Sequence, residues 1–319
     1  MTRLRPLLTL IATIIVVALY NAAPANAALI WDMRWSGPTA TYTIASTSLP
    51  SPWADGLIQG SSSTATIYTV ATKQAGWPDP YSWSAYAAAF SSNYSGTTYS
   101  DNNAHPARVQ VDVGPYGNFD LWFGWAVYIP TSTAATWPDW TTSGGNAWFV
   151  AQEVMGPPDN GSPAVAADIL KTGGQLYLYG ADPWAAVTEW KTAITPGTWV
   201  RVVQHIVFSK YAVQTDSTNP GLLQVWVNGT PQKFLGVPST THQQPNYNAG
   251  GAWISPDGYT LHEATVMNDT TNNYFYLNNY RLGYTAGVSS PFPSGNVTIF
   301  HAGLKVGTTY ADVAPTATS

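Results

Sequence analysis

Hydrophobic and polar residues alternate along most of this 319-residue chain, in short runs separated by turn-forming residues. Alternation with a period of two is typical of strands that bury one face. The pattern predicts strands at 107–113, 120–129, 147–154, 164–170, 175–179, 200–208, 222–227, 274–282 and 297–300. Many short strands with no repeat and no linker predict one sandwich or jelly-roll domain.

Turn signals divide these strands. Lys171-Thr172-Gly173-Gly174 and Asn228-Gly229 predict two hairpins. Helical periodicity is modest and confined to 82–90, which is the only helix candidate. The polar stretch 238–273 is long for a loop in a compact domain, so we expect it to form a lid or binding loop. We expect a disordered tail over 312–319.

The first residues carry the pattern of an export signal. Arg3 and Arg5 precede an apolar run over 7–20, and Ala25-Asn26-Ala27 fits a cleavage site with small residues. A retained anchor helix is the alternative, but the run is short for a membrane span. We therefore expect a signal peptide at 1–27, a secreted protein beginning at Ala28, and a single domain over 28–311.

Charge and cysteine content exclude several function classes. The chain has 12 Lys and Arg against 17 Asp and Glu, and removal of the signal peptide would leave 10 against 17. That acidic balance argues against a nucleic-acid partner. No further segment is apolar enough to insert into a membrane, and we expect a monomer. The absence of cysteine excludes thiol catalysis and cysteine-bound zinc.

Aromatic residues are unusually frequent, with 15 Trp and 19 Tyr, whereas only 9% of residues are charged. Flat rings with a polar edge suit the faces of sugar rings. Alternation places Tyr177 and Tyr179 on one face of their strand, and Gln224 and Trp226 on one face of theirs. We expect these strands to be adjacent and to form a glycan-binding groove; a solvated sheet face is the alternative.

Three stretches together resemble a known family. They are GTWVRVVQHIVFS at 197–209, YFYLNNYRLGYTAG at 274–287 and NVTIFHAGLKVGTTY at 296–310. In this order they resemble secreted polysaccharide lyases with a concanavalin-like jelly roll, of the heparin-lyase-like and glucuronan-lyase-like families, with alginate lyases more distant. The resemblance implies an antiparallel two-sheet sandwich. It also implies β-elimination on a polysaccharide that contains uronic acid.

The family motifs carry over onto particular residues. Arg108-Val109-Gln110 stands where Arg-x-Glu is expected, and Gln152-Glu153-Val154 where Gln-x-His is expected, without the histidine. The late Tyr-x-Lys-x-Gly-x-Tyr strand corresponds to the run from Tyr280 to Tyr284, whose last tyrosine falls one residue early. The resemblance implies catalytic roles for Arg108, Gln152 and Tyr284, and substrate contacts for Gln110, Tyr280 and Arg281, besides Tyr177, Tyr179 and Trp226.

His205 adds a candidate base in mid-strand, since histidine titrates near neutral pH. Two alternatives to a lyase stay open. The missing histidine and the shifted tyrosine favour a non-catalytic glycan-binding jelly roll or an inactive relative. The carboxyl groups of Glu153 and Asp168, on neighbouring predicted strands, favour a glycoside hydrolase.

The sequence specifies no cofactor. Motifs for a serine nucleophile, a phosphate loop and a zinc site are absent. Loop carboxylates such as Asp101, Asp257 and Asp269 could bind Ca²⁺, although nothing specifies a site. Basic residues are few and scattered, so a weakly charged polyuronate is easier to reconcile with this chain than heparin.

Overall fold

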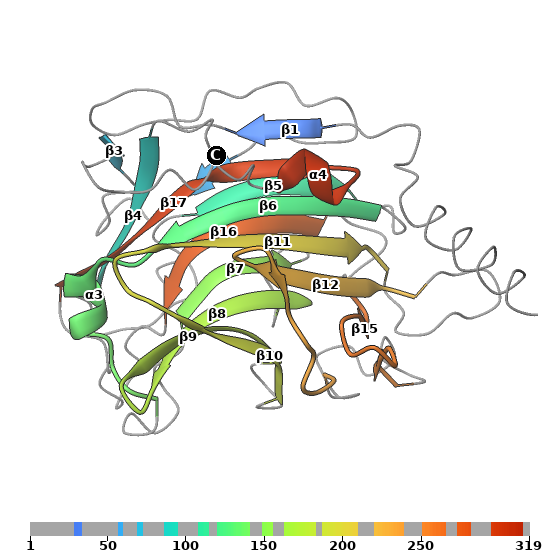
Figure 1. The fold of residues 1–319 in the computed structure, drawn as a ribbon. Coiled ribbons are helices and arrows are strands. Elements are labelled where there is room, and N and C mark those ends of the chain that lie inside the picture. Colours follow the sequence, from blue (N-terminus) through green and yellow to red (C-terminus); the bar gives the residue numbers. More distant parts are fainter. Residues whose placement is uncertain are drawn as a thin grey trace, which may run out of the picture.

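The protein folds into two antiparallel β-sheets that share one hydrophobic core (Figure 1). The computed structural model describes residues 29–33, 57–59, 69–72, 86–94, 108–114, 120–140, 149–155, 163–182, 187–209, 220–238, 251–265, 273–281 and 295–314. Helices within these ranges are short, namely α3 (Thr131–Ala135) and α4 (Tyr310–Val313). The prediction of an all-β, two-sheet, antiparallel jelly-roll sandwich is confirmed.

Sheet A contains ten strands: β1 (Leu29–Met33), β3 (Thr69–Thr72), β4 (Tyr86–Tyr94), β6 (Asp120–Tyr128), β11 (Trp199–Val207), β12 (Leu222–Val227), β13 (Thr230–Pro231), β14 (Trp253–Ile254), β15 (Leu261–His262) and β17 (Gly295–Gly307). Their order is β14-β15-β12-β11-β6-β17-β4-β3, with β1 on β17 and β13 on β12.

Sheet B contains seven strands: β2 (Leu57–Gln59), β5 (Arg108–Gly114), β7 (Phe149–Met155), β8 (Val165–Thr172), β9 (Gln175–Asp182), β10 (Val187–Ile194) and β16 (Asn273–Arg281). Their order is β10-β9-β8-β7-β16-β5-β2. Strands distant in sequence are therefore neighbours, as β16 is with β5 and β7.

The core between the sheets fixes which side of each strand faces outward. Phe123 of β6 and Phe275 of β16 stack across the gap, with ring centroids 4.3 Å apart and planes 2° apart. Trp125 and Trp190 are fully buried in the same core. Burial of a large apolar side chain contributes about 1.5–3 kcal/mol. Alternate residues on each strand must therefore point away from the other sheet.

Both predicted hairpins are present. The turn between β8 and β9 has Gly173 and Gly174 at φ values of +57° and +81°. The turn after β12 has Asn228 at +51° and Gly229 at +79°. Two successive residues with positive φ are the geometry of a type I′ hairpin turn, which glycine and asparagine tolerate best.

Two expectations need correction: the helix candidate and the start of the tail. The helix candidate at 82–90 is wrong where the structure describes it, because Tyr86–Tyr94 is strand β4 and pairs with β3 and β17. Sheet pairing outweighs the weak helical preference of this alanine-rich segment. The long stretch 238–273 contains β14 and β15.

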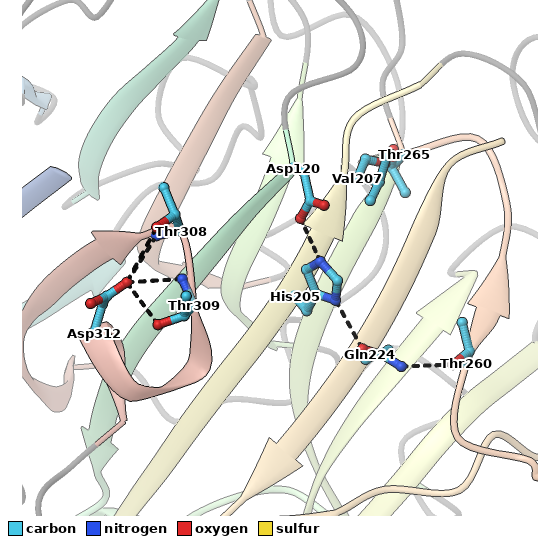
Figure 2. Close-up of polar contacts among 9 residues, drawn as sticks. All are labelled: Asp120, His205, Val207, Gln224, Thr260, Thr265, Thr308, Thr309 and Asp312. Carbon is cyan, nitrogen blue, oxygen red and sulfur yellow. Dashed lines mark hydrogen bonds and ion pairs between the residues drawn. The ribbon is translucent and has the colours of Figure 1, made fainter. Parts of the chain in front are cut away.

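The expected tail begins inside α4. Asp312 accepts hydrogen bonds from the backbone N–H groups of Thr308 and Thr309, and Val313 is fully buried (Figure 2). Residues 312 and 313 therefore belong to a packed helix and not to a disordered tail.

The predicted signal peptide lies outside the described residues. Within the described ranges, no helix is long and apolar enough to cross a membrane.

Candidate active site

A bulge in β7 determines the orientation of its polar residues. Val150 pairs with Asp168 of β8, whereas Gln152 pairs with Ala167, so β7 advances two residues for one on β8. An extra residue in one strand reverses the face of every residue beyond it. Gln152 consequently points between the sheets, and Glu153 points away from them.

Gln152 is fully buried in the space between the sheets. Its Oε1 accepts a hydrogen bond of 2.9 Å from Nε2 of Gln204, a residue of sheet A. Gln204 Oε1 in turn accepts a 2.9 Å hydrogen bond from the Trp125 indole N–H. A side chain enclosed there cannot touch a substrate on the outward face of sheet B, so the catalytic role predicted for Gln152 does not fit its position.

The outward face of sheet B gathers acidic and amide side chains from three adjacent strands. Asn278 Nδ2 of β16 donates a 2.6 Å hydrogen bond to Glu153 Oε1 of β7. Asp168 of β8 stands directly opposite Tyr179 of β9, and the two side chains are hydrogen-bonded. We call Glu153, Asp168, Tyr179 and Asn278 the sheet B cluster. All four residues are buried.

Burial and charge favour the protonated forms of Asp168 and Tyr179. The pKa of Asp168 is raised well above its ordinary value, chiefly by burial and next by the negative charge of Glu153. Its hydrogen bond with Tyr179 partly opposes this shift, and Glu189 of β10 adds to it. The pKa of Tyr179 is also raised, by burial and by the charge and hydrogen bond of Asp168. Perturbed pKa values of this kind cluster at functional sites.

Tyr177 lies beside the sheet B cluster on the same face of β9, because it is two residues from Tyr179. Its ring is partly exposed, and Nζ of Lys191 lies 3.8 Å from the ring centroid. The predicted alignment of Tyr177 and Tyr179 on one face is therefore correct. Together they connect the buried cluster to a solvent-accessible edge.

His205 lies elsewhere, on the outward face of sheet A (Figure 2). Its Nε2 is 2.6 Å from Asp120 Oδ1, and its Nδ1 is 2.8 Å from Gln224 Oε1. Both ring nitrogens are thus engaged, and the whole sandwich separates the imidazole from the sheet B cluster. The fold therefore does not bring the candidate base His205 to the strands of sheet B that carry Arg108 and Gln152.

Trp226 also points outward from sheet A, on β12, whereas Tyr177 and Tyr179 belong to sheet B. The expectation that these strands are adjacent and form one groove is wrong, because alternation identifies a face but not a sheet. Of the remaining predicted residues, the structure describes only the backbone positions. Arg108 pairs with Asn278, Gln110 with Tyr276, Tyr280 with Val150 and Arg281 with Phe149, and Tyr284 lies outside the described residues.

Sequence reasoning missed Asn278 and Glu189. One signal could have found Glu189: the chain has only three glutamates, Glu153, Glu189 and Glu263, and each is at most 3% exposed. Glutamate is seldom buried unless it is paired. The Asn278-Asn279 pair in an otherwise apolar strand was a further signal, since asparagine is unfavourable in strands.

No group of three or more metal-ligating side chains occurs among the residues described. Asp257, one of the suggested calcium ligands, accepts hydrogen bonds from the Ser255 hydroxyl and the Tyr259 backbone within its own turn. Asp101 and Asp269 lie outside the described ranges.

No family model and no curated protein matches this chain. Among solved structures, it is similar to an endo-β-1,4-glucuronan lyase from the fungus Trichoderma reesei, with 13% identity and a TM-score of 0.46 over 88% of this chain and 96% of that one. An alginate lyase from Aplysia kurodai has 8% identity and a TM-score of 0.46, over 88% and 98%. The catalytic domain of a family 131 β-glucanase from Podospora anserina has 12% identity and a TM-score of 0.41, over 88% and 95%. Likenesses at this level leave the reaction of this chain open.

Proposed function

We propose that this protein is an exported polysaccharide lyase that cleaves a uronic-acid polymer by β-elimination on the outward face of sheet B. The observation that carries the proposal is the hydrogen-bonded pair of Tyr179 and Asp168, a phenol and a carboxyl on directly opposed positions. Elimination needs a base for the C5 proton and an acid for the O4 leaving group. This pair supplies both groups side by side.

The proton balance closes through the same hydrogen bond. Asp168, once ionised, removes the proton from C5, and its raised pKa makes the carboxylate a stronger base than ordinary aspartate. The C5–H electron pair forms the C4–C5 double bond as the C4–O4 bond breaks, and Tyr179 protonates O4. Transfer of the proton from Asp168 to the Tyr179 oxygen then restores both groups.

The C6 carboxylate of the sugar must be neutralised before its C5 proton becomes acidic enough to remove. Asn278 contacts Glu153, whose charge acts on Asp168, and its amide group suits a contact with the sugar carboxylate. Arg108 occupies the β5 position directly opposite Asn278, so its predicted role as a carboxylate ligand remains part of the proposal. The acidic surroundings favour a weakly charged polymer over heparin.

Hydrolysis is the second candidate, and the electrostatic environment of Asp168 favours it. A carboxyl held protonated near a second carboxyl is the pattern of a glycosidase acid and its base or nucleophile. Here Asp168 would be the acid, and Glu153, which accepts a hydrogen bond from Asn278, would be the second group.

Ultraviolet absorbance separates the two reactions, because elimination creates a conjugated unsaturated uronate and hydrolysis does not. The mature protein would be incubated with glucuronan, alginate, pectate, hyaluronan and heparin, and with a neutral β-glucan, while reducing ends are counted in parallel. A lyase produces absorbance and reducing ends together on one polyuronate. Reducing ends without absorbance would establish the hydrolase, and neither signal on any polymer would overturn both proposals in favour of a non-catalytic glycan-binding protein.

A further inference from the structure

The outward face of sheet A carries a second group of aromatic and polar side chains, on the opposite side of the sandwich from Asp168. His205 of β11 stands opposite Trp122 of β6 and Gln224 of β12. Further along the sheet, His262 of β15 stands opposite Trp253 of β14. We call Trp122, His205, Gln224, Trp226, Trp253 and His262 the sheet A platform.

Two stacked pairs of rings form the platform. Trp122 lies flat against His205, with centroids 4.1 Å apart and planes 4° apart, and Trp226 lies 5.3 Å from Trp122. Trp253 stacks on His262 at 3.9 Å and 13°. Trp253 is 42% exposed, although a large apolar side chain normally avoids water. Trp122 and Trp226 also pack against Tyr310 of α4, with ring centroids 5.8 Å and 5.3 Å away, so Trp253 presents the most exposed ring of the platform.

Polar side chains connect these two places (Figure 2). Asp120 contacts one nitrogen of His205, Gln224 contacts the other, and Gln224 Nε2 donates a 2.7 Å hydrogen bond to the Thr260 hydroxyl. The carboxylate of Asp120 remains 64% exposed. Hydrogen-bonding groups held in fixed positions lose little conformational entropy when a ligand binds.

We propose that the sheet A platform is a second glycan-binding site, which holds a polysaccharide chain without cleaving it. The ligand class follows from the chemistry of the surface. Flat rings pack against the C–H faces of pyranoses, and sugar hydroxyls can donate hydrogen bonds to the exposed Asp120 carboxylate. An apolar protein surface would instead strip water from the Asp120 carboxylate without replacing its hydrogen bonds, which costs free energy.

The platform faces away from the sheet B cluster, so one polymer chain need not fill both sites. Binding at the platform would keep the enzyme on a polymer network and raise the local concentration of cleavable chain at the reaction centre. The expected effect on cleavage rests on the proposed function, whereas the binding of a polysaccharide by the platform does not.

Native affinity electrophoresis through gels that contain glucuronan, alginate or a neutral β-glucan tests the proposal. Asp168→Asn serves as the background, because binding is then measured without turnover. In that background we expect Trp253→Ala to weaken retention by about tenfold, equivalent to the loss of one aromatic contact. Leu235→Ala, at a 66% exposed apolar residue outside the platform, is the matched control and should leave retention unchanged.

Activity measurements provide a second, independent test of the platform. In the otherwise unaltered protein, Trp253→Ala should slow cleavage of polymer gels and leave turnover of short oligosaccharides unchanged. Equal retention of Trp253→Ala and Leu235→Ala in all three gels would overturn the proposal that the platform binds polysaccharide. If retention falls with Trp253→Ala while no variant or parent cleaves any polymer, the platform stands and the lyase proposal fails.

Discussion

Tyr179 and Asp168 occupy directly opposed positions on β9 and β8, and their side chains are hydrogen-bonded within a buried environment. If this pair supplies the acid and the base, Tyr179→Phe and Asp168→Asn should each lower kcat by about 10²–10⁴-fold. Initial rates of unsaturated-uronate formation check this expectation. Because the two groups act as one unit, the double variant should be hardly slower than the worse single variant.

Glu153→Gln distinguishes the lyase from the hydrolase. The substituted amide keeps the shape of the Glu153 side chain beside Asn278 but cannot act as a base or nucleophile. A lyase should retain much of its rate, whereas a hydrolase should lose nearly all of its activity. Measuring both product types in the same reaction makes the outcome decisive.

The raised pKa of Asp168 predicts an unusual pH profile. Elimination requires the ionised carboxylate, so kcat should rise with pH through a value well above the ordinary range of aspartate. Protonation of Asp168 affects stability in the opposite direction. The folded state binds the carboxyl proton more tightly than the unfolded state does, so its stabilising contribution is present at low pH and is lost as pH rises through the folded pKa. Asp168→Asn should therefore raise Tm at neutral pH while it abolishes activity. A lower Tm at neutral pH would contradict this account.

A substitution at His205 should have little effect on the reaction. Its ring lies on the outward face of sheet A with both nitrogens hydrogen-bonded, remote from the sheet B cluster. His205→Gln should leave kcat on short oligosaccharides within about twofold of the parent, since surface substitutions cost little when no buried feature is broken. A loss of 10²-fold or more would restore the role that the sequence suggested for this histidine.

The burial of His301 predicts that the folded state loses stability in acid. It is fully buried, and burial lowers its pKa to about 4, against a partly opposing effect of hydrogen bonds to the backbone of Asn278 and Ala126. The group contributes full stability above an unfolded pKa near 6.5, and this stability is lost as pH falls towards 4, at a cost of about 3 kcal/mol. Urea melts at pH 7 and pH 4 measure the loss. His301→Gln should reduce the difference between them.

Gly124 predicts a steric effect on the C-terminal helix. A Cβ at this position of β6 would clash with the Val313 carbonyl oxygen of α4. Gly124→Ala should therefore cost about 1–3 kcal/mol, as overpacking does elsewhere. In a chain that ends at Thr308 the clashing atoms are gone, and the same substitution should cost almost nothing. Equal costs in both chains would show that α4 does not press on β6.

Alternation was sufficient to predict β12, whose burial alternates residue by residue, whereas an apolar run predicted β6, which is buried on both faces. It did not predict β4, whose alanine-rich sequence resembles a helix and whose pairing partners lie far along the chain. Local pattern carries no information about such partners.

The site was harder to predict for two physical reasons. The bulge in β7 turns Gln152 inward and Glu153 outward, and nothing in the local sequence marks it. Sheet membership is also a long-range property, so His205 and Tyr179 were assigned to one reaction although they lie on opposite sides of the molecule. The sequence identified the carboxyl group of Asp168 as a candidate, but only the fold shows that Tyr179 is its neighbour.

The hydrogen bond between Gln152 and Gln204 has a consequence for how the two sheets sit on each other. Apolar faces alone can slide by a residue with little change in buried area, since hydrophobic attraction is not directional. A pair of amides buried at one point permits a single alignment, because any displacement would leave Gln152 Oε1 and Gln204 Nε2 without partners in a dry interior. Replacing Gln152 with leucine should therefore give a sandwich whose layers no longer share one defined offset, while Gln204 keeps its hydrogen bond from Trp125.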